Sequence, residues 1–549
     1  MTSKSSAAQA IIVFLAAFFL LWGLDRPYLW QDEAATAVLA ERMLQFGRPL
    51  AYDGKNLITI DYFPAEDADS VNQRTRSAQA AVSFYAHRGD FKPDTTWKWQ
   101  PWGQFVVAAI SLKLLGAGTG AARLPFALAG VLTVWVTYWL VRRCFLDWQL
   151  AAIVSGSLAL NPYWLLHGRQ CRYYALSSLC LVLTLASYAS WQWGPSNRRW
   201  LGAGFFVVLA WLWFQVDYGT IWPALGLLFL DALVAERRTW WRPVLVGMVL
   251  ATAIAPFAYY YEIWGRWSIP ASSWFRRFAV NFFNVNEYVA PGLVVATALG
   301  LMILRWNKLR EVERRLMLIA CAIVLALLIW VPAIAPAAFL RYVILAAPLG
   351  CLLAAWVLFQ LAGRQHRVLA WAGAVVFVLT PALSLPISYP LHLLHGGHYR
   401  AALFRPGFRV LWRNITGKQP DPNGGVVECL RQNSNPDDEI LINYEDIPLM
   451  FYLPNPIRGG VGSFRAEDDG KRPPDVIVLS PSANCVHWPV YLREQQRYQW
   501  RTIPVKIPDV SCGNCPEPHV QESMIGASVP DIFVAKRVST GVSGSTLAK

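Results

Sequence analysis

Charged residues are scarce in this chain: they make up 15% of its 549 residues, whereas soluble proteins carry about 25%. Hydrophobic residues make up 55%, and they recur in long apolar runs between residues 8 and 384. This shortage of charge excludes an ordinary soluble protein of the same size. After residue 385 the sequence becomes polar and rich in proline and glycine, and this change marks the clearest domain boundary.

Two kinds of binding site lack a necessary part. The net charge of +14 is spread over short loops between apolar runs, whereas a nucleic-acid groove needs a continuous basic face. We therefore expect no nucleic-acid partner. The glycine-rich segment 116–120 follows no strand, which excludes a phosphate-binding glycine loop.

Cysteine and histidine offer little for a metal site. Cys512 and Cys515 form one Cys-x-x-Cys pair, with no second pair to complete a zinc site. With Cys429 and Cys485 they give the C-terminal region an even number of cysteines, which favours disulfides in an oxidising compartment over redox or zinc chemistry. Three histidines have a zinc-compatible spacing, but we interpret them as linker residues and do not favour a bound metal: His392, His395 and His398.

Eleven apolar runs have membrane-spanning length or come close to it, because a spanning helix needs roughly 17–25 apolar residues. The first run follows Lys4 as a signal peptide would, but it lacks a good cleavage site and is long enough to remain as a helix. The runs predict a polytopic α-helical membrane protein with about eleven transmembrane helices, at residues 8–24, 124–141, 150–166, 176–193, 201–216, 220–234, 244–260, 289–304, 316–331, 341–361 and 368–384.

A twelfth run, 102–115, is shorter and contains Lys113. If it crossed the membrane, every arginine-rich loop after it would face outward. If it lies in the interface, those loops and Lys4 face the cytoplasm, as the positive-inside rule requires, and the tryptophans at its start suit the headgroup level. We therefore expect interfacial helices in the first outer loop, and cytoplasmic loops that carry Arg142, Arg143, Arg198, Arg199, Arg237, Arg238, Arg242, Arg305, Arg315, Arg364 and Arg367.

This topology divides the chain into four parts: a first transmembrane helix (1–24), an outer loop (25–120), the remaining transmembrane helices (121–386) and a soluble domain (387–549). Short apolar runs bounded by turn residues predict buried strands at 439–443, 475–479 and 531–535, so the last part is expected to be a small α/β domain. The orientation predicts a multi-pass protein of the bacterial cytoplasmic (inner) membrane with this domain in the periplasm.

The outer segment 262–288 combines Arg266, Arg276 and Arg277 with several aromatic residues. One interpretation is that this segment serves a group-transfer reaction, either as a lid over the donor substrate or as a site for an anionic acceptor substrate. The other is a loop that its tryptophans anchor at the membrane interface: Trp264, Trp267 and Trp274.

Two adjacent acids, Asp32 and Glu33, follow the first apolar run and precede a helical stretch at 34–45. The structural interpretation is helix capping by Asp32, with Glu33 in the first turn, where the helix dipole favours acids. The functional interpretation is a carboxylate that removes a proton from an acceptor hydroxyl. This motif alone leaves both open.

Several arginines stand at the outer ends of helices, against the positive-inside trend. Arg169 and Arg172 lie between the third and fourth runs, and the pair Arg341 and Tyr342 begins another run. One alternative is that these side chains snorkel to lipid headgroups. The other is that they converge, with Lys98, on one phosphate, since a planar guanidinium binds two phosphate oxygens at once.

In this order, the motifs resemble those of the GT-C glycosyltransferases, and especially the branch that holds the protein O-mannosyltransferases and the lipid A aminoarabinose transferase. The resemblance covers roughly residues 8–375 and includes an outer C-terminal domain. Many members have His-Pro-Pro or Lys-Pro-Pro where this chain has Trp-Gln-Pro, and Tyr173 or Tyr174 stands where some place an acid. The matching segments are the acid pair at 32–33, then 99–102, 122–130, 172–175 and 341–342.

The resemblance implies a GT-C-like fold and an enzyme that transfers a sugar from a polyprenyl-phosphate donor, undecaprenyl phosphate in a bacterial cell envelope. It implies Asp32 as the general base, and we expect Glu33 to orient or bind the acceptor, which is a glycan, a glycolipid or a protein. We expect inversion in one displacement and no required cofactor. The donor phosphate is expected to bind Lys98, Arg172, Arg341 and Tyr342, and the substrate Arg169, Tyr173 and Tyr174.

Two rival classes are a transporter or lipid flippase without transferase activity, and a noncatalytic scaffold. A transporter is disfavoured because the apolar runs lack acids in their interiors and no inverted repeat is visible. The polar residues gather at one face of the membrane instead, where a group transferase needs them.

Overall fold

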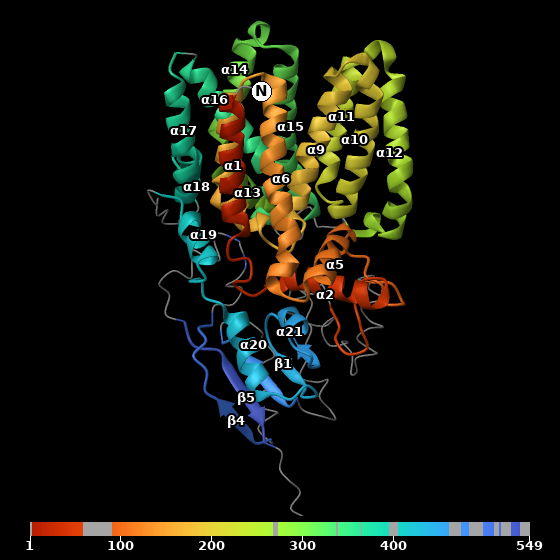
Figure 1. Ribbon diagram of the computed structural model, residues 1–549, viewed down its shortest axis with the longest axis vertical. Helices are drawn as coiled ribbons and strands as arrows, with labels where there is room; N and C mark the ends of the chain where they lie inside the picture. Colours follow the sequence, from red (N-terminus) through yellow and green to blue (C-terminus); the bar gives the residue numbers. More distant parts are fainter. Residues whose placement is uncertain are drawn as a thin grey trace, which may run out of the picture.

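The computed structural model describes residues 3–58, 91–266, 273–335, 339–363, 365–394, 404–459, 474–481, 498–509, 515, 517 and 529–538. Long helices form an upper layer and a small sheet forms a lower layer (Figure 1). The helices of the first loop lie between the two layers, beside the sheet. The expected combination of a helical membrane part and a small C-terminal α/β domain is confirmed.

All eleven apolar runs are helical. By length and composition, seven helices among the described residues are able to cross a membrane, or eight if the segment 274–289 and α14, bent by 76°, form one span. Because α7, α11 and α17 are shorter, helix length does not confirm eleven spans. The eleven helices are α1 (Ser3–Leu21), α6 (Thr119–Phe145), α7 (Trp148–Ala159), α9 (Tyr174–Trp193), α10 (Arg199–Val216), α11 (Ile221–Ala235), α12 (Trp241–Tyr260), α14 (Gly292–Leu304), α15 (Glu311–Ile334), α16 (Ala347–Ala362) and α17 (Arg367–Leu379).

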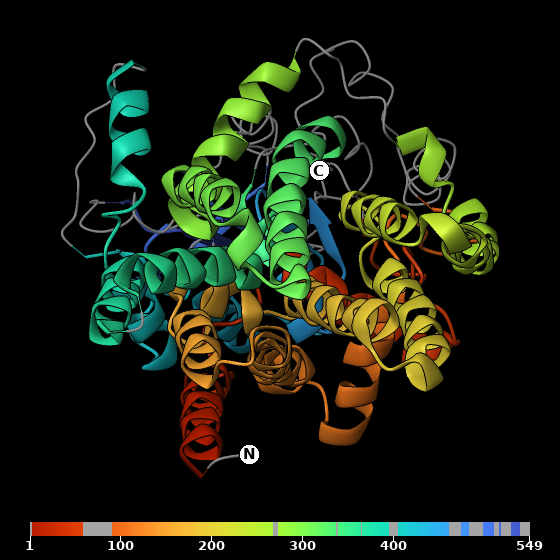
Figure 2. The ribbon, with the colours of Figure 1, turned by 90° about the horizontal axis from the view of Figure 1, so that it is seen from above.

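Shorter helices connect these long ones. In the run 150–166, Asn161 caps a second helix by accepting hydrogen bonds from the backbone N–H groups of Tyr163 and Trp164. Seen from above, α10–α12 lie on one side of the bundle and α16 and α17 on the other (Figure 2). The shorter helices include α8 (Pro162–Gly168), α13 (Trp274–Asn284), α18 (Leu385–Leu394), the π-helix η5 (Val285–Val289) and the 3-10 helices η7 (Leu340–Tyr342) and η8 (Ile344–Ala346).

The first outer loop starts and ends at the same end of the bundle. Its helices are α2 (Gln31–Phe46) and α5 (Gly103–Leu115), which pack against each other. Ser5 at the start of α1 bonds to Tyr138 near the end of α6, and Gly120 at the start of α6 lies against Asp25, just after α1. The helix α5 therefore does not carry the chain across the bundle. This agrees with the positive-inside argument, which predicted that the run 102–115 lies in the interface.

The C-terminal sheet has the strand order β2-β1-β3-β5-β4. The first three strands in this order are parallel, and β5 pairs antiparallel with β3 and with β4. The three predicted strands correspond to β1, β3 and β5. The elements of this part are α19 (Gly407–Ile415), α20 (Pro422–Asn433), β1 (Ile440–Ile442), α21 (Ile447–Tyr452), β2 (Ile457–Gly459), β3 (Val476–Leu479), β4 (Trp500–Ile503) and β5 (Phe533–Arg537).

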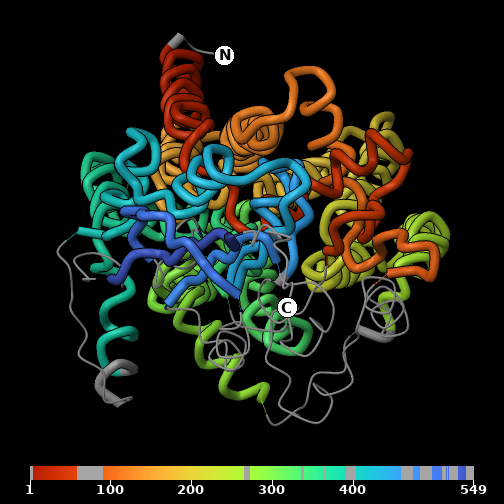
Figure 3. Tube along the Cα trace, turned by 90° about the horizontal axis from the view of Figure 1, so that it is seen from below, coloured from red at the N-terminus to blue at the C-terminus, as the bar shows by residue number. Residues whose placement is uncertain are grey.

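The C-terminal part docks on the segment that leads into α2. Seen from below, the C-terminal strands and the first loop lie next to each other under the helices (Figure 3). Polar contacts join them: Tyr28 N donates to Asp421 (2.8 Å), Leu29 N to the Tyr452 hydroxyl (3.0 Å) and Gln31 Nε2 to Asp446 (2.6 Å). The start of the first outer loop is therefore held from two sides, by the bundle and by the C-terminal part.

Candidate active site

Asp32 and Glu33 lie in the first turn of α2, whose first ten residues are all buried. The residue before this helix is Trp30, and no side chain caps the helix. The capping interpretation of Asp32 is therefore wrong. A buried carboxylate is costly unless it is paired, so both acids need partners from other segments.

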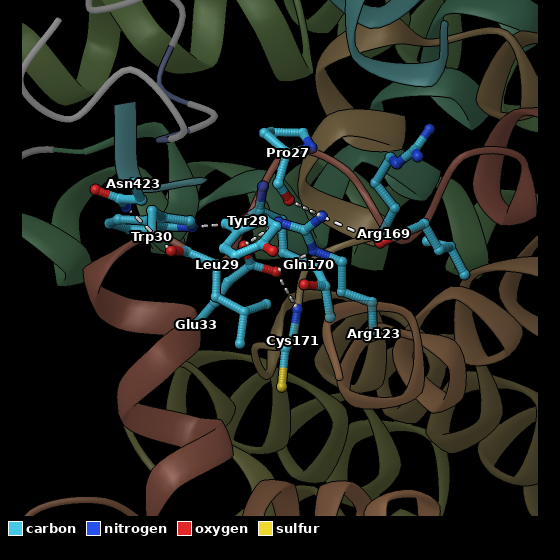
Figure 4. Close-up of polar contacts among 12 residues, drawn as sticks. Pro27, Tyr28, Leu29, Trp30, Glu33, Arg123, Arg169, Gln170, Cys171 and Asn423 are labelled. Atoms are coloured by element: carbon cyan, nitrogen blue, oxygen red, sulfur yellow. Dashed lines mark hydrogen bonds and ion pairs between the residues drawn. The ribbon is translucent and has the colours of Figure 1, made fainter. Parts of the chain in front are cut away.

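Glu33 forms a bidentate ion pair with Arg123 of α6 (Figure 4). Arg123 Nε lies 2.8 Å from Oε1 and Nη2 lies 2.6 Å from Oε2, while the backbone N–H of Cys171 also donates to Oε1 at 2.7 Å. Nη1 of Arg123 also donates hydrogen bonds to the carbonyl oxygens of Leu24 and Pro27. Glu33 is completely buried, and these contacts tie α2 to the start of α6 and to the segment before α9.

Asp32 meets two arginines from distant parts of the chain. Its Oδ2 lies 3.3 Å from Nη1 of Arg341 and 3.8 Å from Nη2 of Arg172. Arg172 also donates from Nη1 to the Asp32 carbonyl and to the Thr36 hydroxyl, each at 3.1 Å. The predicted meeting of an acid from the first outer loop with arginines from well-separated helices is present.

Aromatic rings surround the guanidinium of Arg341. Its central carbon lies 4.1 Å from the ring centre of Phe339, 5.4 Å from that of Trp30 and 5.5 Å from that of Tyr342. Such stacking restricts a guanidinium and leaves its edge available for hydrogen bonds. Arg341 is therefore fixed with its charge directed toward Asp32.

These groups open on a cavity of about 180 Å³ between α2, the start of α5 and the ends of α10, α15 and η7. Five of the predicted site residues line it: Asp32, Arg172, Tyr173, Arg341 and Tyr342. The other lining residues are Trp99, Gln100, Pro101, Gln104, Val216, Asp217, Tyr218, Gly219, Thr220, Val331, Ile334 and Ala335. The cavity thus combines two cations, two carboxylates and several aromatic and amide groups.

Four predicted residues do not line this cavity. Glu33 is occupied by Arg123, and the ammonium group of Lys98 pairs with Glu262. Tyr174 is buried with its ring against those of Tyr173 and His167. The fourth is Arg169, whose guanidinium binds the carbonyl oxygens of Phe19, Trp22 and Gly23 at the end of α1 at 2.7–3.1 Å.

Arg169 and Arg172 do not snorkel to lipid headgroups. Arg169 is 2% exposed and Arg172 is 6% exposed, and both bind protein oxygens. A snorkelling side chain would instead hold its charged group in the headgroup region. That alternative is therefore wrong for these two residues.

Asp217 is a cavity residue that the sequence reasoning missed. It lies between α10 and α11, where it accepts hydrogen bonds from the backbone N–H of Gly219 at 3.0 Å and from the hydroxyl of Thr220. Burial raises the pKa of its carboxyl, and the hydrogen bonds from Thr220 and Gly219 lower it, with a net rise. The available signal was an acid directly after the apolar run 201–216, at the same outer end as Arg172.

The segment 262–288 is not a plain loop, because α13 and η5 lie within it. Trp264 is 69% exposed, and Trp267 lies outside the described residues. Asn281 of α13 donates to the backbone carbonyl of Leu328 in α15 at 3.2 Å. The segment therefore packs on the bundle through a buried amide, and its described arginines do not line the cavity.

The structure tests only part of the predictions for the C-terminal cysteines and for the three spaced histidines. Cys429 is a free thiol in α20, with its sulfur 3.9 Å from the side-chain nitrogen of Asn433, so the expected disulfide is wrong for this cysteine. Cys485, Cys512, His395 and His398 lie outside the described residues. Within the described part of the chain, no three His, Cys, Asp or Glu residues are grouped as a metal site.

No protein-family model matches this chain, and no curated protein matches it in sequence. Two solved structures match over nearly the whole length of both chains. The first is ArnT from Cupriavidus metallidurans bound to undecaprenyl phosphate, with a TM-score of 0.57 and 15% identity over 98% of this chain and 99% of that one. The chain has the ArnT fold.

The apo structure of the same ArnT agrees, with a TM-score of 0.52 and 17% identity over 97% of this chain and 98% of ArnT. The predicted resemblance to the aminoarabinose transferase branch of the GT-C glycosyltransferases is thus confirmed at the level of the fold. Because the match spans both chains, the ArnT fold accounts for the helical layer and for the C-terminal part together.

Proposed function

We propose that this chain is a membrane glycosyltransferase that moves a sugar from a polyprenyl-phosphate donor to an acceptor hydroxyl. The observation that carries the proposal is the meeting of Asp32, Arg172 and Arg341 at one cavity. ArnT, with the same fold, was solved with undecaprenyl phosphate bound. Undecaprenyl phosphate is therefore the carrier that we expect here, and a glycan, a glycolipid or a protein is the acceptor.

The arginines serve the leaving group. When the bond between the anomeric carbon and the phosphate oxygen breaks, its electron pair stays on the polyprenyl phosphate. Arg172 and Arg341 are held in place by Thr36 and by the ring of Phe339, so they need little reorganisation to stabilise this charge. Tyr342 and Tyr173 line the same cavity and contact the donor next to them.

Asp32 serves the nucleophile. It accepts the proton of the acceptor hydroxyl while the acceptor oxygen forms its bond to the anomeric carbon. Its carboxylate lies within 4 Å of both arginines, so the base and the phosphate-binding groups border the same space. One displacement with inversion follows, and Asp217 binds sugar or acceptor hydroxyls in the same cavity.

The remaining predicted residues support this geometry from outside the cavity. Glu33 holds α2 through Arg123, and Arg169 holds the end of α1. Lys98 has Glu262 as its partner, so we assign the donor phosphate to the two arginines and not to this lysine. The chemistry requires no metal in this assignment, because fixed cations take the role that a divalent ion would have.

The orientation follows from the charge at the two ends of the bundle. Arg142 bonds to Ser5 at the start of α1, so the arginine-rich loop after α6 lies at the end opposite Asp32. With that end in the cytoplasm, the cavity and residues 387–549 face the periplasm of a bacterium, and the chain sits in the inner membrane. The first outer loop, 25–120, is then periplasmic as well.

The test is donor turnover by the purified full-length chain in lipid nanodiscs. Undecaprenyl-phosphate-linked aminoarabinose, mannose and arabinose are supplied in turn, without nucleotide or ion gradient, together with a cell-envelope extract as the source of acceptor hydroxyls. Undecaprenyl phosphate released by transfer of the sugar to an acceptor, or to water, is measured. We expect one donor to be consumed, and D32N to abolish its consumption while the chain still inserts and folds.

The matched control is D25N, because Asp25 begins the same loop but its side chain is 72% exposed. D25N should turn over the donor at the wild-type rate. Undiminished turnover by D32N would remove Asp32 as the base, and a wild-type chain that consumes no polyprenyl-phosphate donor would contradict the proposed function.

A further inference from the structure

A carboxylate from the C-terminal region lies under the segment that carries Arg341. Glu517 is 1% exposed, and its two oxygens accept the backbone N–H groups of Leu340 (3.1 Å) and Arg341 (3.2 Å). These N–H groups belong to the first two residues of η7, a helix of three residues. The first N–H groups of a helix have no partner within it, so Glu517 supplies what η7 cannot supply itself.

A buried histidine lies on the other side of this carboxylate. Nε2 of His167, in α8, is 4.0 Å from Oε1 of Glu517, and both side chains are inaccessible to solvent. Nδ1 of His167 donates to the carbonyl oxygen of Tyr163 at 2.8 Å, which fixes the ring with Nε2 toward Glu517. Burial by itself raises the pKa of Glu517, but His167 and Arg341 outweigh burial, so the pKa lies below its ordinary value.

Arg341 belongs to the short turn η7 and not to one of the long helices. Its side chain is held by the rings of Phe339, Trp30 and Tyr342, and two of these three residues belong to the same short segment. A displacement of η7 would therefore move the guanidinium and the rings of Phe339 and Tyr342 together, away from Asp32. Leu340 is buried in the hydrophobic core of the bundle, and the bonds from Glu517 to the backbone add polar contacts that oppose this displacement.

We propose that Glu517 is a positioning residue, through which the C-terminal region completes the active site by fixing the turn that carries Arg341. The inference rests on the proposed function, because Arg341 is assigned there to the leaving phosphate. Glu517 does not line the cavity, so it acts through Arg341 and not on the substrate. The C-terminal region is thus part of the catalytic unit and not an appended module.

The test is a double-mutant cycle of E517Q and R341A in the full-length chain, read by donor turnover and by binding of undecaprenyl phosphate. E517Q removes the charge and one acceptor oxygen, and we expect a loss in donor kcat/KM of up to about 100-fold, the loss that a 1 Å misplacement of a catalytic group by a remote mutation can cause. In the R341A background, E517Q should cost less than about threefold, since the group it positions is gone.

Binding of undecaprenyl phosphate should show the same pattern, and it needs no turnover by the weak variants. The matched control is D437N, an exposed acid of the C-terminal region, which should behave as wild type in both backgrounds. Equal losses from E517Q with and without Arg341, or no loss at all, would overturn the inference.

A second variant keeps the test decisive if E517Q folds poorly. E517D retains the charge on a shorter side chain, and H167Q removes the facing imidazole. Both should reduce phosphate binding in the Arg341 chain, and neither should in the R341A chain. If the wild type consumes no donor, the proposed function fails; if it is active and every Glu517 variant matches it, only the present inference fails.

Discussion

Asp32 and Glu33 are neighbours in the sequence but have different partners. Oδ2 of Asp32 lies within 4 Å of two arginines that line the same cavity, whereas Glu33 is completely buried in its pair with Arg123. On an α-helix, adjacent side chains point about 100° apart, so two consecutive acids in one turn reach different surroundings. Asp32 was predicted as the base and Glu33 as a second site residue, whereas in the structure Glu33 pairs with Arg123 and does not line the cavity.

Replacing Glu33 by glutamine is expected to destabilise the fold. The change leaves Arg123 buried without its counter-charge, which typically costs about 3–5 kcal/mol in free energy of unfolding. Thermal unfolding of E33Q in detergent measures it. The control is E428Q, because Glu428 forms a surface pair with Arg431 worth at most about 1 kcal/mol. A stable but inactive E33Q would instead place Glu33 in the chemistry.

Single elements were predicted well where their pattern is strongly apolar. The segment 274–284 was missed as a helix because α13 has polar and apolar residues on opposite faces, so it forms no apolar run. The run 150–166 was predicted as one helix, but Asn161 and Pro162 end α7 and start α8. This break places His167 and Arg169 at a helix end, where they contact other segments.

Arg169 is expected to stabilise α1. The last carbonyl groups of a helix lack partners, and Arg169 donates to that of Phe19 in the last turn of α1 and to those of Trp22 and Gly23 directly after it. R169A should lower the free energy of unfolding by at least about 1.5–3 kcal/mol, the contribution of one hydrogen bond from a charged group.

The same variant separates two roles of Arg169. Binding of undecaprenyl phosphate, measured below the unfolding temperature, should remain within about twofold of wild type if Arg169 touches no substrate. The control R409A removes an exposed arginine of α19 and should change neither quantity. A large loss of phosphate binding with unchanged stability would return Arg169 to the substrate-binding set.

At the scale of the whole molecule, the helical bundle and the C-terminal part are joined by polar contacts in two places. The contacts run from Tyr28, Leu29 and Gln31 to α20 and α21, and from Glu517 to the turn of Arg341. These contacts border both sides of the Asp32 site. If Glu517 positions Arg341 as proposed, the arrangement of the groups around the cavity depends on docking of the C-terminal part, and we expect conditions that change docking to change activity.

One such condition is pH, acting through Asp446. Burial raises its pKa from 3.8 to about 6, and the hydrogen bond from Gln31 lowers it in part. Because the folded state binds this proton more tightly, the stabilisation is fully present below about pH 4 and is lost as pH rises through about 6. The shift of about two units corresponds to at most about 3 kcal/mol.

The measurement is the melting temperature of the wild type and of D446N between pH 4 and pH 8. D446N retains a hydrogen-bonding oxygen without the charge, so the difference between the two proteins should grow as pH rises through 6, in favour of D446N. A difference that stays constant over this range would contradict the predicted ionisation.

The orientation of the molecule gives a further prediction. In a cysteine-free background, D437C should react with a membrane-impermeant maleimide in intact spheroplasts, because the proposed orientation places the C-terminal part in the periplasm. R238C, in an exposed arginine-rich loop at the other end, should react only after permeabilisation. The reverse labelling pattern would invert the topology and place the cavity in the cytoplasm.

The sequence by itself determined the class of fold, the apolar helices, the three strands β1, β3 and β5, and the grouping of Asp32 with Arg172 and Arg341. These features follow from the lengths of apolar runs and from charges that oppose the positive-inside trend, which are local properties. Even there, the number of spans stayed open, because α7, α11 and α17 are short.

Only the tertiary structure decided the partners of the buried polar groups. It paired Glu33 with Arg123 and Lys98 with Glu262, and it brought Asp217 and Glu517 to the site. A buried charge is stabilised by the opposite charge or the N–H group that the folded chain places next to it. That choice depends on contacts between segments hundreds of residues apart, and no local pattern in the chain encodes it.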